Sequence, residues 1–184
     1  MHYVPLVSYV IFCSAVALVL SVYATPSVAW NGNQLRSLCG IAIMWRPVGR
    51  MLFSALHFQM FIVMFILSKG GPMAFLSVGI LTAGIGFTSF EMDTHWHMHF
   101  VFVTVYVVAS SAYATSHAVL NKDMWPYALA MHFGAAMFLI SFAWTVSEGV
   151  RKWTTANTVW ELLWLAAWMT THLRLVGKLE AELQ

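Results

Sequence analysis

The chain has 184 residues, of which 60% are hydrophobic and 9% are charged, and its mean hydropathy is +0.75. Soluble domains carry about 25% charged residues because they need a polar surface. This composition therefore excludes an ordinary soluble fold and indicates a membrane protein, and the continuous apolar runs along the chain predict an all-α fold. The formal charge of +2, with Lys and Arg scattered along the chain, gives no basis for a nucleic-acid partner.

The first predicted element is a membrane-spanning helix over residues 4–23. It resembles the apolar part of a signal peptide, but residues 1–3 contain no Lys or Arg, so we expect it to be retained. Residues 33–46 are too short to cross a bilayer and predict an interfacial helix or a re-entrant segment. Because Arg36, Arg46 and Arg50 lie around it, we expect these side chains to bind the phosphates of anionic phospholipids.

Two more spanning helices are predicted over residues 51–68 and 73–90, with a short loop between them. The second carries small residues at Gly79, Thr82 and Gly86. Small residues let helix backbones approach closely in lipid, so this face is predicted to pack against another helix.

A polar cluster opens the fourth predicted span, residues 96–119, and consists of Glu91, Asp93, His95, His97 and His99. In a continuous helix, Glu91, His95 and His99 share one face and could bind zinc, copper or iron. The alternative is a solvated junction between two helices, without a metal. We favour the junction, because carboxylates are costly inside a bilayer.

The last two spans are predicted over residues 125–147 and 153–173. In the first of them, Ala130 and Gly134 predict a packing face. Glu161 lies near the start of the final span, and we expect it to form a hydrogen bond with a histidine or hydroxyl of another helix. A helical stripe follows, which we expect to pack, to face lipid or to contact other subunits: Trp160, Trp164, Trp168 and His172.

Histidines within the predicted spans could also ligate a haem. A b-type haem in a bundle needs two histidines at similar depth on different helices. His57, His99 and His132 are the candidates, but in a six-span arrangement no pair of them matches clearly in depth. The sequence therefore predicts no cofactor, with haem b or a histidine-bound metal as the alternative.

Parts of the chain resemble the DRAM/Sfk-type family of six-helix membrane proteins. The resemblance rests on the small-residue run 79–86, the following Glu91, Asp93 and His99, and the Glu161 and Thr171-His172 positions of the last span. It covers the chain from residue 51 onward, whereas the family's long first loop is reduced here to residues 25–50. The resemblance implies a six-helix plan, endomembranes and lipid-linked anchors, without an agreed catalytic set.

These features predict a single polytopic helical bundle over residues 1–184. The chain has no Gly-x-Ser-x-Gly, His-Glu-x-x-His, phosphate loop or Cys-x-x-Cys, so we expect no enzyme activity. The favoured function is a structural or accessory subunit that contacts lipids and other membrane subunits. We expect an organelle membrane, the mitochondrial inner membrane before an endomembrane. The alternatives are a stand-alone DRAM/Sfk-like lipid-related protein and a redox protein with histidine-bound haem or metal.

Overall fold

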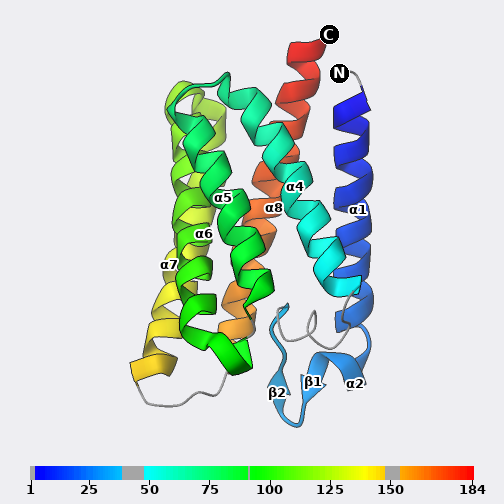
Figure 1. Cartoon of the computed structure of the whole chain (residues 1–184), viewed down its shortest axis with the longest axis vertical. Coiled ribbons are helices and arrows are strands. Elements are labelled where there is room, and N and C mark those ends of the chain that lie inside the picture. Colours follow the sequence, from blue (N-terminus) through cyan, green and yellow to red (C-terminus); the bar gives the residue numbers. More distant parts are fainter. Residues whose placement is uncertain (1–2, 39–47, 91, 148–153) are drawn as a thin grey trace.

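The computed structural model describes residues 3–38, 48–90, 92–147 and 154–184. Over these residues the chain is an all-α bundle, as predicted, with one short hairpin (Figure 1). Each of the six predicted apolar segments corresponds to one long helix. These are α1 (Tyr3–Tyr23), α4 (Val48–Ser68), α5 (Pro72–Ser89), α6 (Met92–Leu120), α7 (Trp125–Ser147) and α8 (Thr155–Leu183).

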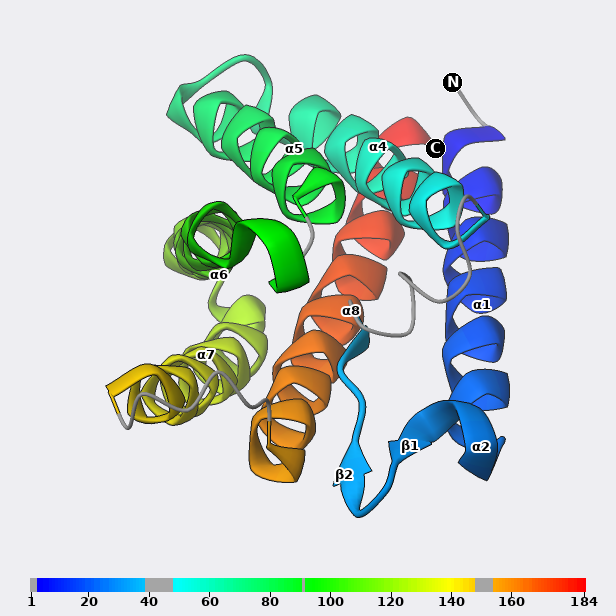
Figure 2. The same cartoon turned by 60° about the horizontal axis from the view of Figure 1, so that its bottom comes forward.

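The long helices alternate in direction, so α1 begins and α8 ends at the same end of the bundle (Figure 1). Viewed from the other end, α8 lies in the middle, with α4 and α5 on one side, α6 and α7 on another, and α1 opposite them (Figure 2). The final helix therefore contacts elements from both ends of the sequence, namely α1, β2, α4 and α7.

Four helical segments are long and apolar enough to cross a membrane: Tyr3–Tyr23, Pro72–Ser89, His95–Leu120 and Lys122–Thr145. In α4 only Phe53–Ser68 is found as a shorter apolar segment, and α8 is not among the candidates. Six spans were expected. Within the described ranges, four helices have the length and apolar composition that a membrane span requires.

The first connection forms a small unit at the lower end of the bundle (Figure 1). It contains α2 (Pro26–Ala29) and an antiparallel hairpin of β1 (Trp30–Asn31) and β2 (Gln34–Leu35). Gly32 has φ 60° at the first turn position, where a tight hairpin favours glycine. The predicted interfacial helix is therefore wrong at Gln34–Leu35, because these residues pair as a strand. Residues 39–46 lie outside the described ranges.

Local sequence signals account for the helix ends. Pro72 occupies the first turn of α5, after Lys69 and Gly70 with positive φ. At the start of α8, Thr154 and Asn157 form a reciprocal capping box. A 3-10 turn, η1 (Lys122–Met124), joins α6 to α7.

The predicted small-residue positions differ in their surroundings. A Cβ atom on Gly134 would lie 2.9 Å from the Trp164 backbone, so α7 and α8 approach closely there. A Cβ on Gly86 would meet the Phe102 ring of α6 at 2.4 Å. Gly79 has open space around it, and Thr82 and Ala130 are exposed.

Candidate functional site

The polar interior of the bundle is the candidate site, and among the described residues α8 contributes more buried polar side chains to it than any other helix. Asn157, Thr158, Glu161, Thr171 and His172 are all buried along this helix. These side chains are enclosed because α8 is central, and the chemistry of these groups is therefore set by neighbouring helices.

The tryptophan stripe of α8 faces inward as well. Trp164 and Trp168 are 5% and 0% exposed, and Trp160 is partly buried against the core. The expectation that this stripe contacts lipid or other subunits is wrong for Trp164 and Trp168, because the central place of α8 puts their rings in the core. Gly86 also packs within the chain, against the Phe102 ring of α6.

Gln59 of α4 and His172 of α8 bind each other in the core. Gln59 Nε2 lies 3.1 Å from His172 Nε2, and both side chains are buried. Gln59 Oε1 and His172 Nδ1 have no partner among the described residues. The pair therefore links two helices but leaves one polar atom of each side chain without a hydrogen bond. Buried polar atoms of this kind are commonly bonded by an ordered water molecule.

An aromatic cluster lies beside α5 and α6. The Phe87 ring meets the rings of His57 and His99 edge-on, with centroid distances of 5.4 and 6.1 Å. His57 Nδ1 lies 2.6 Å from the Phe53 carbonyl oxygen, and His99 Nδ1 lies 2.8 Å from that of Phe90. As donors, both Nδ1–H groups are taken up by backbone carbonyls, which fixes the orientation of both rings.

Two further bonds join helices through aromatic side chains. Trp168 Nε1 donates to the Tyr106 hydroxyl at 2.9 Å, which ties α8 to α6. Tyr113 donates its hydroxyl to the Met64 carbonyl oxygen at 2.7 Å, which ties α6 to α4. The Trp168 indole and the Tyr113 hydroxyl thus find partners on other helices, as is usual for buried aromatic side chains with a polar atom, whereas the buried Trp164 Nε1 has no partner among the described residues.

At the lower end of α8, Asn157 connects the capping box to α7. Its Nδ2 donates to Ser141 Oγ at 2.9 Å, and its Oδ1 accepts from Thr145 Oγ1 at 3.0 Å. The same Oδ1 accepts from the Thr154 backbone amide at 3.1 Å. One amide side chain thus fixes the angle at which α8 leaves the preceding connection.

Glu161 holds the segment that follows the hairpin. Its Oε2 accepts from the Leu38 backbone amide at 3.4 Å. Nearby, both backbone polar groups of Leu35 are bonded to α8. Its amide donates to Thr155 Oγ1 at 3.1 Å, and its carbonyl oxygen accepts from Thr158 Oγ1 at 2.9 Å. The partner of Glu161 is therefore a backbone amide, whereas a histidine or hydroxyl was expected.

The predicted polar cluster does not form one face. His95 has φ −133° and ψ 44°, which interrupts α6, so the alignment of His95 with His99 in a continuous helix is wrong. His95 and His97 are exposed, whereas His99 is buried. Glu91 lies outside the described residues, and only the backbone of Asp93 is described.

Of the three candidate haem ligands, His57 and His99 lie against the same Phe87 ring, whereas His132 lies apart from them. His132 is exposed on α7 and lies 2.7 Å from Thr115 Oγ1 through its Nε2, while His57 points into the core. In the described part of the chain, no three His, Cys, Asp or Glu side chains are placed to hold a metal ion.

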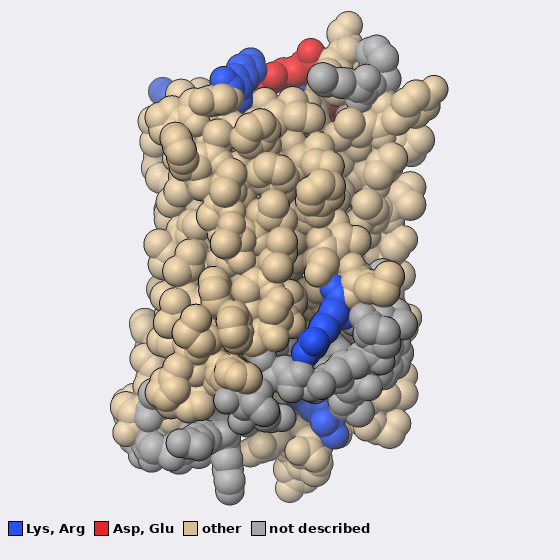
Figure 3. Space-filling view, viewed as in Figure 1, with Lys and Arg blue, Asp and Glu red and all other residues tan. Residues whose placement is uncertain are grey.

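Charged side chains gather at the upper end of the molecule and in its lower part, with an uncharged surface between them on the face shown in Figure 3. At the upper end Lys69 Nζ lies 3.2 Å from Glu182 Oε2, which joins the ends of α4 and α8. The pKa of Lys178, on the last turns of α8, is lowered mainly by partial burial and to a smaller extent by the nearby positive charge of Arg174.

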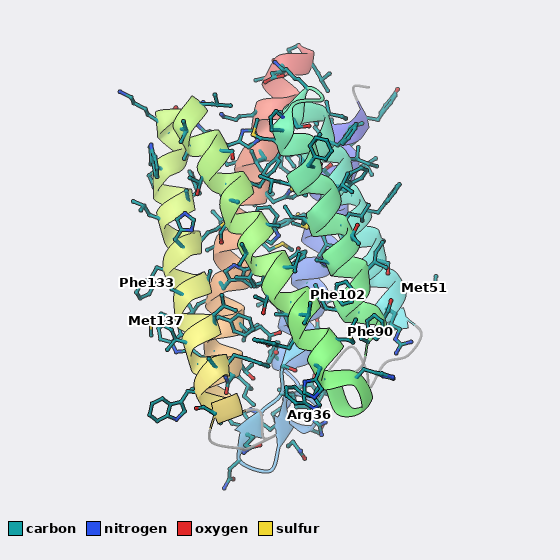
Figure 4. All side chains as sticks on the ribbon, turned by 60° about the vertical axis from the view of Figure 1, so that its left-hand side comes forward. Arg36, Met51, Phe90, Phe102, Phe133 and Met137 are labelled. Atoms are coloured by element: carbon teal, nitrogen blue, oxygen red, sulfur yellow. The ribbon has the colours of Figure 1, made fainter. Side chains whose placement is uncertain are left out.

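Of the three predicted lipid-binding arginines, Arg36 and Arg50 are partly buried, and Arg46 lies outside the described residues. Arg36 lies at the hairpin end of the bundle (Figure 4). Its carbonyl oxygen accepts from Tyr23 at 2.9 Å, and its Nε has no partner among the described residues. The guanidinium group of Arg36 therefore has donor capacity to spare at this end.

Several residues of the site were missed from the sequence: Gln59, Tyr106, Tyr113, Thr155 and Asn157. Gln59 could have been identified from the sequence, because it is a polar side chain in the middle of an apolar run. Such a residue in a membrane helix faces the interior of the bundle. The tyrosines and Asn157 carried no comparable signal, because such residues are also common near helix ends.

No protein-family model matches the chain, and neither the curated proteins nor the solved structures give a match.

Proposed function

We propose that the chain is a six-span, non-catalytic accessory subunit of a larger membrane assembly. The observation that supports it best is the use of buried polar groups as links between helices. Gln59, Tyr113, Asn157 and Trp168 each bond a group on another long helix. In lipid, apolar surface gives little drive for association, so such bonds and close packing hold a bundle together.

The proposal includes α4 and α8 as spans. α4 is packed between α5, α8 and α1, and α8 is surrounded by other helices, so polar residues on their inner faces need not meet lipid. Arg174 and Lys178 are close to the upper end of α8, where long basic side chains can reach the headgroups. The location proposed is the mitochondrial inner membrane, with anionic phospholipid bound near Arg36 and Arg50.

The test is the composition of the native assembly. After mild solubilisation, native mass measurement should find the chain at a fixed stoichiometry with the same subunits in every preparation. The purified chain alone should convert no substrate and take up no electron. A purified chain that is fully folded and catalyses a reaction would show that the accessory role is wrong.

A second candidate is a redox or metal-binding role for His57 and His99. It is favoured by one observation: the Nδ1 atoms of both rings are held by backbone carbonyls, as in many metal-ligating histidines. Elemental analysis and a visible spectrum of the purified chain test it directly. Stoichiometric metal or a haem band, lost in a His57→Ala variant, would replace the accessory role.

A further inference from the structure

His132 is a polar side chain on the outer face of the bundle at membrane depth. It lies in the apolar segment Lys122–Thr145, seven residues after the start of α7, or about 10 Å along the helix axis. Its neighbours Leu129 and Phe133 are 59% and 63% exposed. Phe133 and Met137 lie on the outer side of α7 (Figure 4), so this face meets lipid or another protein.

The bonding of His132 is incomplete. Its Nε2 lies 2.7 Å from Thr115 Oγ1, which also lies 2.9 Å from the Ser111 carbonyl oxygen. The Thr115 hydroxyl has one hydrogen, so it donates to only one of them. When it donates to Ser111, His132 Nδ1 is left as a free acceptor; when it donates to His132, Nδ1–H is a free donor. Among the described residues, Nδ1 has no partner in either state.

An unpaired ring nitrogen is costly in hydrocarbon, where no water can bind it. The same side of α7 carries alanines at Ala136 and Ala143, four and eleven residues after His132, and both are exposed. These spacings place the three residues on one helix face. Small side chains there let another backbone come close enough for a side-chain hydrogen bond to reach His132.

We propose that a second copy of this chain docks on this face, with α7 packed along α7 of its partner. A neutral imidazole offers one donor and one acceptor, so the two tautomers of His132 complement each other as Nδ1–H to Nδ1. A twofold axis along the membrane normal places both rings at the same depth and presents the same surface from each copy. The inference goes beyond the accessory role, which needs no second copy.

The test uses the purified full chain in liposomes. In a variant carrying Cys13→Ser and Cys39→Ser, Ala136→Cys should form a disulfide-linked dimer on oxidation. Thr82→Cys, exposed on α5, is the matched control and should cross-link much less. Without added cysteines, His132→Leu should weaken dimerisation by about tenfold, the effect expected of one interhelical hydrogen bond. Phe133→Leu, at the next residue, should change it less.

Three results would overturn the proposal. One is a chain that stays monomeric at every protein-to-lipid ratio. Another is a dimer that is insensitive to His132→Leu and cross-links as well at position 82 as at position 136. The third is cross-linking of Ala136→Cys in native membranes to a different chain only. A monomeric result leaves the accessory role standing, because that role is tested by the other subunits of the assembly.

Discussion

Among single residues, Gln59 and His172 illustrate how a polar side chain is used inside this bundle. Gln59 is visible in the sequence as an interruption of an apolar run, which predicts that it faces inward. Its partner is not visible, because it lies 113 positions away, on a helix whose contacts depend on the whole arrangement. For the same reason the sequence left open whether Trp164 and Trp168 pack inward or face outward.

The Gln59–His172 bond should be measurable as a coupling. Gln59→Leu and His172→Leu should each destabilise the bundle, since each leaves a buried polar partner unpaired. The double variant should lose less than the sum, by about 1 kcal/mol, as found for hydrogen bonds between membrane helices. Reversible unfolding in mixed micelles measures this cycle. Strict additivity of the two losses would mean that the side chains do not bond.

At the scale of helices, the sequence predicted where the chain is helical better than which face packs. Of the predicted positions Gly79, Thr82 and Gly86, only Gly86 lies against another helix, while Gly84 in the same run lies against the His57 ring of α4. The direction in which a face points is set by the neighbouring helices, which local composition does not encode. The interruption of α6 at His95 lies in the polar run where a junction between two helices was favoured, although no proline marks the residue at which it occurs.

The α7–α8 contact offers a matched pair of glycine substitutions. Gly134→Ala should destabilise the bundle by about 1–3 kcal/mol, because its methyl group would press on the Trp164 backbone at 2.9 Å. Gly79→Ala has open space and should be neutral or slightly stabilising. Unfolding free energies of the two variants decide the matter. Equal losses at both positions would contradict the close approach of α7 and α8.

The docking of the hairpin on α8 can be tested by amide exchange. Thr155→Val removes the acceptor of the Leu35 amide, which should then exchange its hydrogen faster. Thr170→Val is the control, because Thr170 is exposed and bonds only within α8, to the Ala166 carbonyl oxygen. Hydrogen exchange at Leu35 that is unchanged by Thr155→Val would show that the hairpin is held by other contacts.

For the whole molecule, composition together with the continuous apolar runs indicated an all-α membrane bundle, and four apolar helical segments fit that class. Residues 51–68 and 153–173 were predicted as spans from their apolar side chains, but α8 and the whole of α4 are not among the four candidates, and several of their polar residues are buried against neighbouring helices. Hydropathy treats every residue as exposed to lipid. That assumption does not hold for a central helix such as α8, whose buried polar side chains bond other helices. The proposed structural role depends on these bonds.

The most direct test of the six-span account is the side of the membrane on which each connection lies. Single cysteines are introduced at Asn33, Gly70, Ala156 and Gln184 in a variant with Cys13→Ser and Cys39→Ser, and sealed vesicles are treated with an impermeant thiol reagent. The account predicts that Gly70→Cys and Gln184→Cys react from one side, and Asn33→Cys and Ala156→Cys from the other. Labelling of Asn33→Cys and Gly70→Cys from the same side would show that α4 does not cross, and the same result for Ala156→Cys and Gln184→Cys would exclude α8.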